Sequence, residues 1–351
     1  MKEKFRNFVK VVGLPRLIIG SLFIIVLIAA SAYKLDMAAL FTNILRRYGM
    51  WGILVLAMVP GIQCGIGPNF GISLGIVCGL LGALLSIEFG FTGFMAFIFA
   101  VIFAGVIASL VGAAYGWFLN KVKGSEMTVS TYIGFASIAV MNIFWASAPF
   151  QNGEIKWPIG GTGVRTTVSL QSSFKGVLDT FMEFKIGAIT VPTGLILFFF
   201  LMCAVIWVFL NSKTGKAMRA AGANPVFARA SGINVDRMRI LGTAISTALA
   251  GIGIVAYASA YGFLQMYNAP MQMGFQCVAA VFIGGASTSD AKISHVIIGT
   301  LLFHGLLVVG LPVASKILAG TDLSDIMRMI IQNGIIIYAI TKSTGGSVRA
   351  E

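Results

Sequence analysis

Long apolar runs separated by short polar segments limit the fold of this chain more than any other feature of its sequence. Three of the longest runs, residues 189–210, 241–264 and 296–315, contain no Asp, Glu, Lys or Arg. A run of about 20 apolar residues can cross the hydrocarbon core of a bilayer as an α-helix. Helices satisfy their own backbone hydrogen bonds, which open sheets and irregular loops cannot do in lipid. We therefore expect an all-α, polytopic membrane protein in which residues 1–351 form a single transmembrane domain.

The length of the chain bounds the number of spans. Its 351 residues, 58% of them hydrophobic, leave room for about ten helices of membrane length joined by short loops. They leave no room for a separate ATPase domain. We predict about ten transmembrane helices, some of them broken, with the last one returning over 325–340. An amphipathic segment is predicted at 34–48, with Leu35, Ile44 and Leu45 on one side.

Positive charge gathers at the ends of the apolar runs and predicts their orientation. The chain has 25 Lys and Arg against 12 Asp and Glu, a formal net charge of +13. Orientation and contact with anionic membrane lipid explain this balance in a membrane protein, so we expect no nucleic-acid partner. The rule that cytoplasmic loops are basic places both termini and the loop at 212–240 in the cytoplasm. The loop at 148–188 has nearly balanced charges and is placed outside, as are Arg46 and Arg47, which break the rule.

A Gly-rich stretch over 61–79 suggests a discontinuous membrane helix. Gly67, Gly71, Gly75 and Gly79 recur every four residues, and small residues at that spacing let helix backbones approach closely in lipid. Breaks are predicted at Pro60-Gly61 and Gly67-Pro68. Broken backbone at membrane depth is tolerated where it is buried or lines a cavity.

Polar residues beside these breaks are candidates for a translocation pathway. A second polar, Gly-bounded segment at 262–285 occupies the corresponding place in the other half of the chain, which points to a shared cavity. The alternative, that these residues only cap and pack the broken backbone, stays open. The pathway candidates are Gln63, Asn69, Phe70, Ser73, Gln272 and Gln276.

The loop at 212–240 has the features of a docking element. Asn224-Pro225 is a turn-initiating pair that suits the start of a helix, and Ser231-Gly232 ends the short helical turn that follows. A helix this short is not stable alone and needs a surface behind it. The alternative is a solvated, positive-inside loop.

This loop resembles the cytoplasmic loop of permease subunits of ABC importers for sugars, nucleosides and branched-chain amino acids. The resemblance rests on the pattern G-x-x-x-R-A-x-G-x-N-P-x-x-A-x-x-x-G-I-N, which runs here from Gly215 to Asn234. It implies a type II importer fold and a coupling helix that sits in a cleft of an ATPase subunit. The residues assigned to ATPase coupling are Arg219, Gly222, Asn224, Pro225, Ala228, Arg229, Ser231, Gly232 and Ile233.

The same resemblance implies the partners and the substrate class. We expect two permease subunits, identical or different, two ATP-binding subunits and an extracytoplasmic substrate-binding protein, in a bacterial plasma (inner) membrane. Monosaccharide and nucleoside both fit, and a permease for branched-chain amino acids stays open. Ser130-Thr131 resembles the nucleoside-type branch, and the acid that ribose-type permeases often carry near position 69 is absent.

Catalytic signatures are missing from the sequence. No G-x-x-x-x-G-K-[ST] phosphate loop is present, so ATP and Mg²⁺ are expected on the partner ATPase, with no cofactor on this chain. The four cysteines lie in apolar runs without a CxxC, and the two histidines form no H-E-x-x-H, so no metal site is predicted. An intramembrane enzyme would need a paired nucleophile and base or a metal cluster, and the sequence shows neither. The charge-free spans argue against a secondary transporter, which usually needs an ionisable group at mid-membrane.

Overall fold

The computed structural model describes residues 14–157, 162–317, 329, 333–334 and 336–337. The basic residues before position 14, the span predicted at 325–340 and the cytoplasmic orientation predicted for the two termini lie outside these residues.

The described chain is a helical bundle with a few short strands. Its helices are α2 (Leu14–Ala32), α3 (Met37–Leu56), α4 (Met58–Gln63), α5 (Ile72–Glu88), α6 (Gly93–Leu119), α7 (Glu126–Ser147), α8 (Val177–Thr180), α9 (Thr193–Asn211), α10 (Lys213–Ala223), α11 (Pro225–Ala230), α12 (Val235–Tyr261), α13 (Ala269–Ile283) and α14 (Ile293–Ile317). The strands are β1 (Thr167–Ser169), β2 (Phe184–Ile186), β3 (Ile189–Val191) and β4 (Phe263–Gln265).

Five helices in the described part of the chain are long and apolar enough to cross a membrane: α6, α7, α9, α12 and α14. Shorter apolar helices, α5 and α13 among them, complete the bundle. The protein is therefore mostly helical and membrane-embedded, as predicted, while the number of about ten spans stays a prediction.

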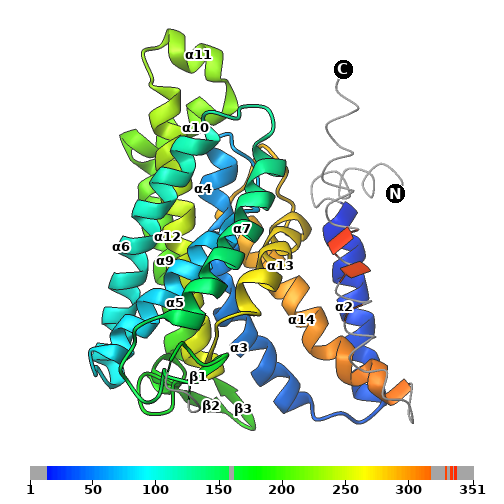
Figure 1. Cartoon of the computed structure of the whole chain (residues 1–351). Coiled ribbons are helices and arrows are strands. Elements are labelled where there is room, and N and C mark those ends of the chain that lie inside the picture. Colours follow the sequence, from blue (N-terminus) through cyan, green and yellow to red (C-terminus); the bar gives the residue numbers. More distant parts are fainter. Residues whose placement is uncertain (1–13, 158–161, 318–328, 330–332, 335, 338–351) are drawn as a thin grey trace, which may run out of the picture.

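Helix α12 lies at the centre of the bundle and packs against α3, α4, α5, α6 and α10. Figure 1 shows α10 and α11 at one end, here called the α11 end, and β1, β2 and β3 at the opposite end, here called the hairpin end. Helix α2 stands beside α14, which it contacts, at one side of the bundle (Figure 1).

The glycine stripe packs α5 against its neighbours, as its spacing predicts. A Cβ on Gly75 would lie 2.5 Å from the Thr247 carbonyl oxygen of α12, and a Cβ on Gly79 would lie 2.9 Å from the Cα of Gly251. Gly71 faces the Tyr115 ring of α6 in the same way. Gly67 does not belong to this contact, because a Cβ there would meet its nearest neighbours, Met127 and Thr288, only at 3.6 Å or more.

One of the two predicted breaks is wrong. Pro60 and Gly61 lie inside α4, where Pro60 falls in the first helical turn and so removes no intrahelical hydrogen bond. The non-helical segment runs instead from residue 64 to 71, between α4 and α5, and is here called the break. The second predicted position, Gly67-Pro68, lies within it.

The predicted amphipathic segment 34–48 is the first part of α3, which continues without interruption to Leu56. Asp36 caps this helix by accepting a hydrogen bond from the Ala39 amide at 3.0 Å. The face formed by Leu40, Ile44 and Tyr48 is buried.

The loop at 148–188 has more structure than its sequence suggests, and this is where the fold departs from all-α. Strand β1 pairs antiparallel with β4, and β2 pairs with β3 in a hairpin. The β1–β4 pair attaches the loop to the residues just before α13. An ion pair of 3.3 Å between Arg46 Nε and Asp179 Oδ2 attaches α8 to α3.

Candidate functional site

The loop at 212–240 folds into three capped helices. Ser212 accepts a hydrogen bond from the Gly215 amide at 3.1 Å, and Asn224 accepts one from the Phe227 amide at 3.0 Å. Asn234 caps α12 in the same way through the Arg237 amide, at 3.0 Å. Side-chain oxygens at helix starts satisfy amides that have no partner within the helix. These caps explain why Ser and Asn stand at these positions and confirm the short helix predicted after Asn224-Pro225.

The three helices share a small core. Ala221 of α10, Ala228 of α11 and Val235 of α12 are buried together, with Ile233 and Met238 packed against them. A buried core of this kind holds α10, α11 and the start of α12 in one arrangement. They are here called the coupling unit, residues 213–239.

Helix α11 presents apolar side chains outward, a feature that the sequence reasoning missed. Val226 is 76% exposed and Phe227 is 67% exposed. The signal was available, because these two large apolar residues stand side by side in a loop that carries six basic residues. Large apolar residues exposed side by side on a helix are typical of a surface that binds a partner.

The coupling residues predicted from the sequence divide into two groups. Asn224, Pro225, Arg229, Ser231 and Gly232 are exposed on α11 or next to it in the chain, and Arg219 is exposed on α10. Ala228 is buried inside the coupling unit, while Gly222 and Ile233 are half-buried. Gly222 faces the break between α4 and α5 and lies away from the exposed surface of α11.

Asn69 is a structural residue of the break. Its amide Nδ2 donates to Ser246 Oγ of α12 at 2.9 Å, and its Oδ1 accepts a hydrogen bond from the Tyr115 hydroxyl of α6 at 3.2 Å. Ser246 in turn donates to the Ala57 carbonyl at 2.6 Å. The Asn69 side chain is 2% exposed, so these contacts cap and pack the broken backbone, and the residue does not line a cavity.

A cavity of about 350 Å³ lies at the α11 end of the break. Its wall consists of residues of the break, residues at the start of α7, glycines and hydroxyl-bearing side chains. These residues are Gly65, Ile66, Gly67, Gly124, Ser125, Glu126, Met127, Thr128, Gly222, Thr288 and Ser289. Cavities of this size hold small-molecule ligands in other proteins, about 300–1,000 Å³.

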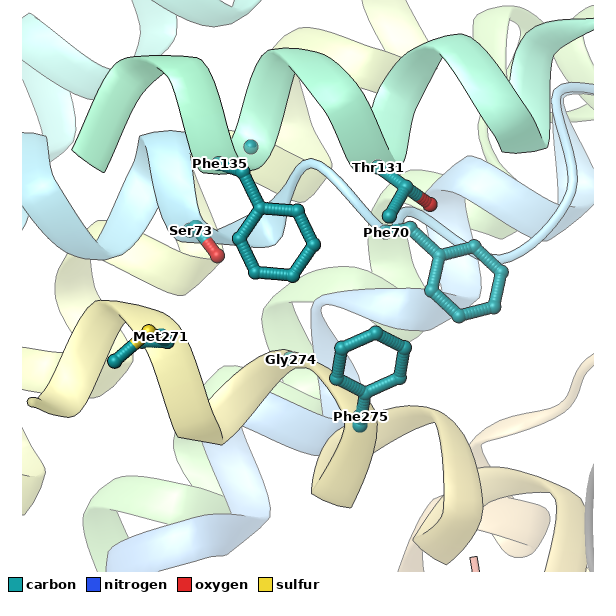
Figure 2. A pocket seen from close by; sticks show the side chains of 8 residues that line it. Phe70, Ser73, Thr131, Phe135, Met271, Gly274 and Phe275 are labelled. Atoms are coloured by element: carbon teal, nitrogen blue, oxygen red, sulfur yellow. The ribbon is translucent and has the colours of Figure 1, made fainter. Parts of the chain in front are cut away.

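A second, much smaller pocket of about 10 Å³ lies between α5, α7 and α13. Figure 2 shows three phenylalanine rings around it, Phe70 next to α5, Phe135 of α7 and Phe275 of α13. The ring centroids of Phe70 and Phe275 are 5.8 Å apart, and those of Phe135 and Phe275 are 6.5 Å apart. A space of about 10 Å³ holds at most a single water molecule, so the rings close this position.

The small pocket contains two of the predicted pathway residues and several that were missed. Phe70 and Ser73 line it, and Ser73 Oγ donates to the Pro270 carbonyl at 2.6 Å. On α13 the wall is formed by Met271, Gly274 and Phe275, whereas the predicted Gln272 and Gln276 each lie one position further along the helix. Gln272 is exposed and Gln276 is buried outside the pocket wall. No charged residue lines the pocket.

Gln63 has a different role from the one predicted. Its Nε2 donates to the Ala291 carbonyl at 2.6 Å, which attaches the end of α4 to the segment between α13 and α14. It lines neither cavity.

Two ion pairs connect the coupling unit to the start of α7. Lys123 Nζ lies 2.5 Å from Asp236 Oδ1, and Arg239 pairs with Glu126. The first pair is exposed, while the side chains of Arg239 and Glu126 are only 9% and 13% exposed. Since α7 carries Phe135, these pairs fix one wall of the small pocket relative to α12.

The remaining candidates for chemistry are packing residues. His304 is fully buried and stacks on Trp51 with ring centroids 4.4 Å apart. Cys64, Cys78, Cys203 and Cys277 are free and buried. Among the described residues, no three His, Cys, Asp or Glu side chains come together as a metal site would require.

Comparison with known proteins identifies relatives of this arrangement. The model of the family described as branched-chain amino acid transport system / permease component matches residues 40–340. The probable ABC transporter permease protein YphD of Escherichia coli (strain K12) is 32% identical over 137 residues, 38% of this chain and 39% of that protein.

Two further relatives are named for their substrates. The nucleoside ABC transporter permease protein NupB of Lactococcus lactis is 24% identical over 189 residues, 51% of this chain and 50% of that protein. The galactose/methyl galactoside import permease protein MglC of Salmonella typhimurium is 28% identical over 181 residues, 48% of this chain and 49% of that protein. These matches span about half or less of each relative's length. No solved structure matches the chain.

Proposed function

Because the chain belongs to the family of branched-chain amino acid transport system permease components, we propose that it is the membrane-spanning permease subunit of an ATP-driven, binding-protein-dependent ABC importer. The solute is a small polar molecule, a monosaccharide or a nucleoside. The observation that carries the proposal is α11, a short helix with exposed Val226 and Phe227 on a rigid unit that contacts the membrane break.

Coupling to an ATPase explains the design of the α11 end. Val226 and Phe227 form an apolar tip on α11, Arg229 is exposed on the same helix, and Arg219 is exposed on α10. An apolar anchor with a polar, basic rim is the usual composition of a protein–protein interface. The ATPase subunits bind ATP and Mg²⁺, and this chain carries no cofactor.

The pathway runs along α5, α7 and α13. The cavity of about 350 Å³ has room for a sugar or a nucleoside and supplies hydroxyl groups from Ser125, Thr128, Thr288 and Ser289. The phenylalanines around the small pocket form the constriction that closes the pathway in this conformation. Tight affinity belongs to the binding protein, so weakly polar, uncharged walls suffice at the constriction.

Membership of the family supports the following assembly. A second permease subunit, identical or different, completes the membrane unit, and the extracytoplasmic binding protein docks at the hairpin end. The α11 end and both termini face the cytoplasm of a bacterial cell, and the chain is a multi-pass protein of its inner membrane. No step of the reaction is catalysed by this chain.

A permease for branched-chain amino acids is the second candidate, and the family description favours it. The wall of the larger cavity carries the charged Glu126 as well as the hydroxyl groups of Ser125, Thr128, Thr288 and Ser289, and we rank a sugar or a nucleoside first because of these hydroxyl groups.

Uptake measurements test the proposal. Cells that express this chain with its ATPase and binding protein would receive labelled ribose-like sugars, purine and pyrimidine nucleosides, and leucine, with the ATPase active or inactivated. We expect ATP-dependent uptake of the sugars or the nucleosides. Uptake that persists without ATPase activity and collapses with the ion gradient would contradict it.

A variant at the tip tests the coupling role. Phe227→Glu should remove the ATPase from the purified complex and abolish uptake, while the amount of chain in the membrane stays unchanged. Phe184→Glu, at an exposed phenylalanine of the hairpin end, is the matched control and should keep the ATPase bound. Retention of the ATPase by Phe227→Glu would show that α11 is only a solvated loop.

A further inference from the structure

Gly222 is the point where the coupling unit touches the membrane break. A Cβ built on Gly222 would lie 2.8 Å from the Gly65 amide nitrogen and 2.9 Å from the Cys64 carbonyl carbon, and still closer to the Gln63 carbonyl oxygen. All three neighbours are backbone atoms. Side chains can turn aside to admit a methyl group, but backbone cannot do so without displacing a helix. Glycine is therefore the one residue that permits this contact.

The break is adapted to the same contact from its own side. Gly65 has φ +82°, and a Cβ there would lie 2.9 Å from the Cα of Gly222. The left-handed region is open to glycine and strained for most other residues. The two glycines thus place α10 and the end of α4 in direct backbone contact, in agreement with the packing of α10 against α4.

Helix α12, which follows α11 in the chain, contacts the break as well. Gly242 of α12 faces Cys64, since a Cβ on Gly242 would lie 2.5 Å from the Cys64 Cβ and 2.6 Å from its Sγ. Residues 63–65 are therefore held between α10, which precedes α11, and α12, which follows it. Because the core of the coupling unit fixes these helices to α11, a displacement of α11 reaches residues 63–65 through two close contacts.

We propose that Gly222 is a positioning residue of the transport cycle, which transmits the motion of α11 to the break through its backbone contact with residues 63–65. This inference rests on the proposed function, and it gives Gly222 a role different from ATPase contact. The break ends at the small pocket, since Phe70, which lines that pocket, follows soon after Gly65 in the chain. Movement of residues 63–65 therefore reaches the phenylalanine constriction along a short, continuous segment.

The test separates coupling from assembly. Gly222→Ala would be purified with its ATPase and binding protein in lipid nanodiscs or vesicles, and ATP hydrolysis and solute uptake would be measured in the same preparation. We expect the complex to assemble and to hydrolyse ATP within about twofold of the unsubstituted complex, while uptake per ATP falls at least tenfold. Gly310→Ala is the control, because a Cβ there meets nothing within 4 Å, and it should leave both activities unchanged.

The outcomes are distinct. Unchanged uptake per ATP in Gly222→Ala would overturn the proposal, and so would a proportional fall of hydrolysis and uptake, which a merely structural role predicts. Failure of the proposed function would look different, since the unsubstituted complex would then show no ATP-dependent uptake.

A second measurement needs no substitution. Hydrogen exchange of the unsubstituted complex, with and without ATP and vanadate, should show protection changing together in residues 219–224 and 63–67. A change confined to residues 219–224 would overturn the proposal even if Gly222→Ala fails to assemble.

Discussion

The contact between α5 and α12 predicts a measurable penalty for a single methyl group at Gly75. Gly75→Ala would place its Cβ 2.5 Å from the Thr247 carbonyl oxygen and 2.7 Å from the Ala250 Cβ. Non-bonded carbon atoms prefer separations of about 3.5–4.0 Å, so the two helices must move apart by roughly an ångström. Neither neighbour can rotate out of the way, because one is backbone and the other is attached directly to it.

Two opposing terms set the size of the effect. Overpacking a tightly packed contact costs about 1–3 kcal/mol, and a rigid backbone neighbour places this case toward the upper value. Replacing glycine by alanine inside a helix returns roughly 0.5–1 kcal/mol. We therefore expect Gly75→Ala to lower the free energy of unfolding by about 1–2 kcal/mol, which for a chain of 351 residues corresponds to a Tm lower by roughly 1–3 °C.

The buried cysteines provide the assay. Because all four are free and buried, a thiol-reactive fluorescent dye added to the purified protein in detergent reports unfolding as temperature rises. Gly20→Ala is the matched control, since a Cβ on that residue of α2 meets nothing within 4 Å, and its Tm should be unchanged or higher. A Tm for Gly75→Ala equal to or above that of the unsubstituted chain would refute the reasoning.

Three further predictions concern the polar residues. Burial raises the pKa of the Asp179 carboxyl to about 6, so the folded chain binds this proton more tightly than the unfolded chain. The resulting stability is present near pH 4 and is lost as pH rises through about 6. Asp179→Asn should therefore flatten this part of the curve of Tm against pH. Glu126→Gln leaves the buried Arg239 guanidinium without its carboxylate and should lower the free energy of unfolding by about 3 kcal/mol. Lys123→Gln breaks an exposed pair and should lower it by about 1 kcal/mol or less. Equal losses of stability in chemical denaturation would contradict this ranking. Asn69→Ala removes two buried hydrogen bonds and should cost about 2–3 kcal/mol in the same denaturation measurement, and an unchanged stability would show that Asn69 does not hold the break.

The helical fold follows from the sequence wherever length and composition suffice. The long charge-free runs became α9, α12 and α14, and the spacing of Gly71, Gly75 and Gly79 predicted close helix contact. The position of the break did not follow, because Pro60 is compatible with the first turn of a helix as well as with a helix end. The strand pair β1–β4 could not be found either, since three-residue strands carry no periodicity and pair across about a hundred residues of chain.

Two of the predicted pathway residues, Phe70 and Ser73, line the small pocket, while the role of that pocket in transport stays a prediction. Polarity selected Gln272 and Gln276 on α13, whereas the pocket is lined by Met271 and Phe275 at the same i, i+4 spacing. Adjacent residues on a helix point about 100° apart, so the sequence located the segment but not the face. Asn69 was selected because it is polar and lies beside a break, yet its side-chain amide donates a hydrogen bond to Ser246 of α12 and so attaches the break to that helix. Only the neighbouring helices reveal that difference.

The distribution of charge in the described residues bears on how such a bundle can change shape. Ion pairs between distant segments lie at its two ends, with Arg46–Asp179 near the hairpins and Lys123–Asp236 and Arg239–Glu126 beside the coupling unit. Between them the break is held by neutral hydrogen bonds and glycine contacts. A neutral hydrogen bond contributes about 0.5–1.5 kcal/mol net. Removing one partner of a buried ion pair such as Arg239–Glu126 costs about 3–5 kcal/mol, whereas the more exposed pairs Arg46–Asp179 and Lys123–Asp236 contribute less. We therefore expect the α11 end, which holds the buried Arg239–Glu126 pair, to move as a unit while the break between α4 and α5 rearranges, because the neutral contacts at the break are less costly to exchange. A charge introduced at Ser246, beside Asn69, should consequently slow solute uptake more strongly than the same charge at the exposed residue Gln272.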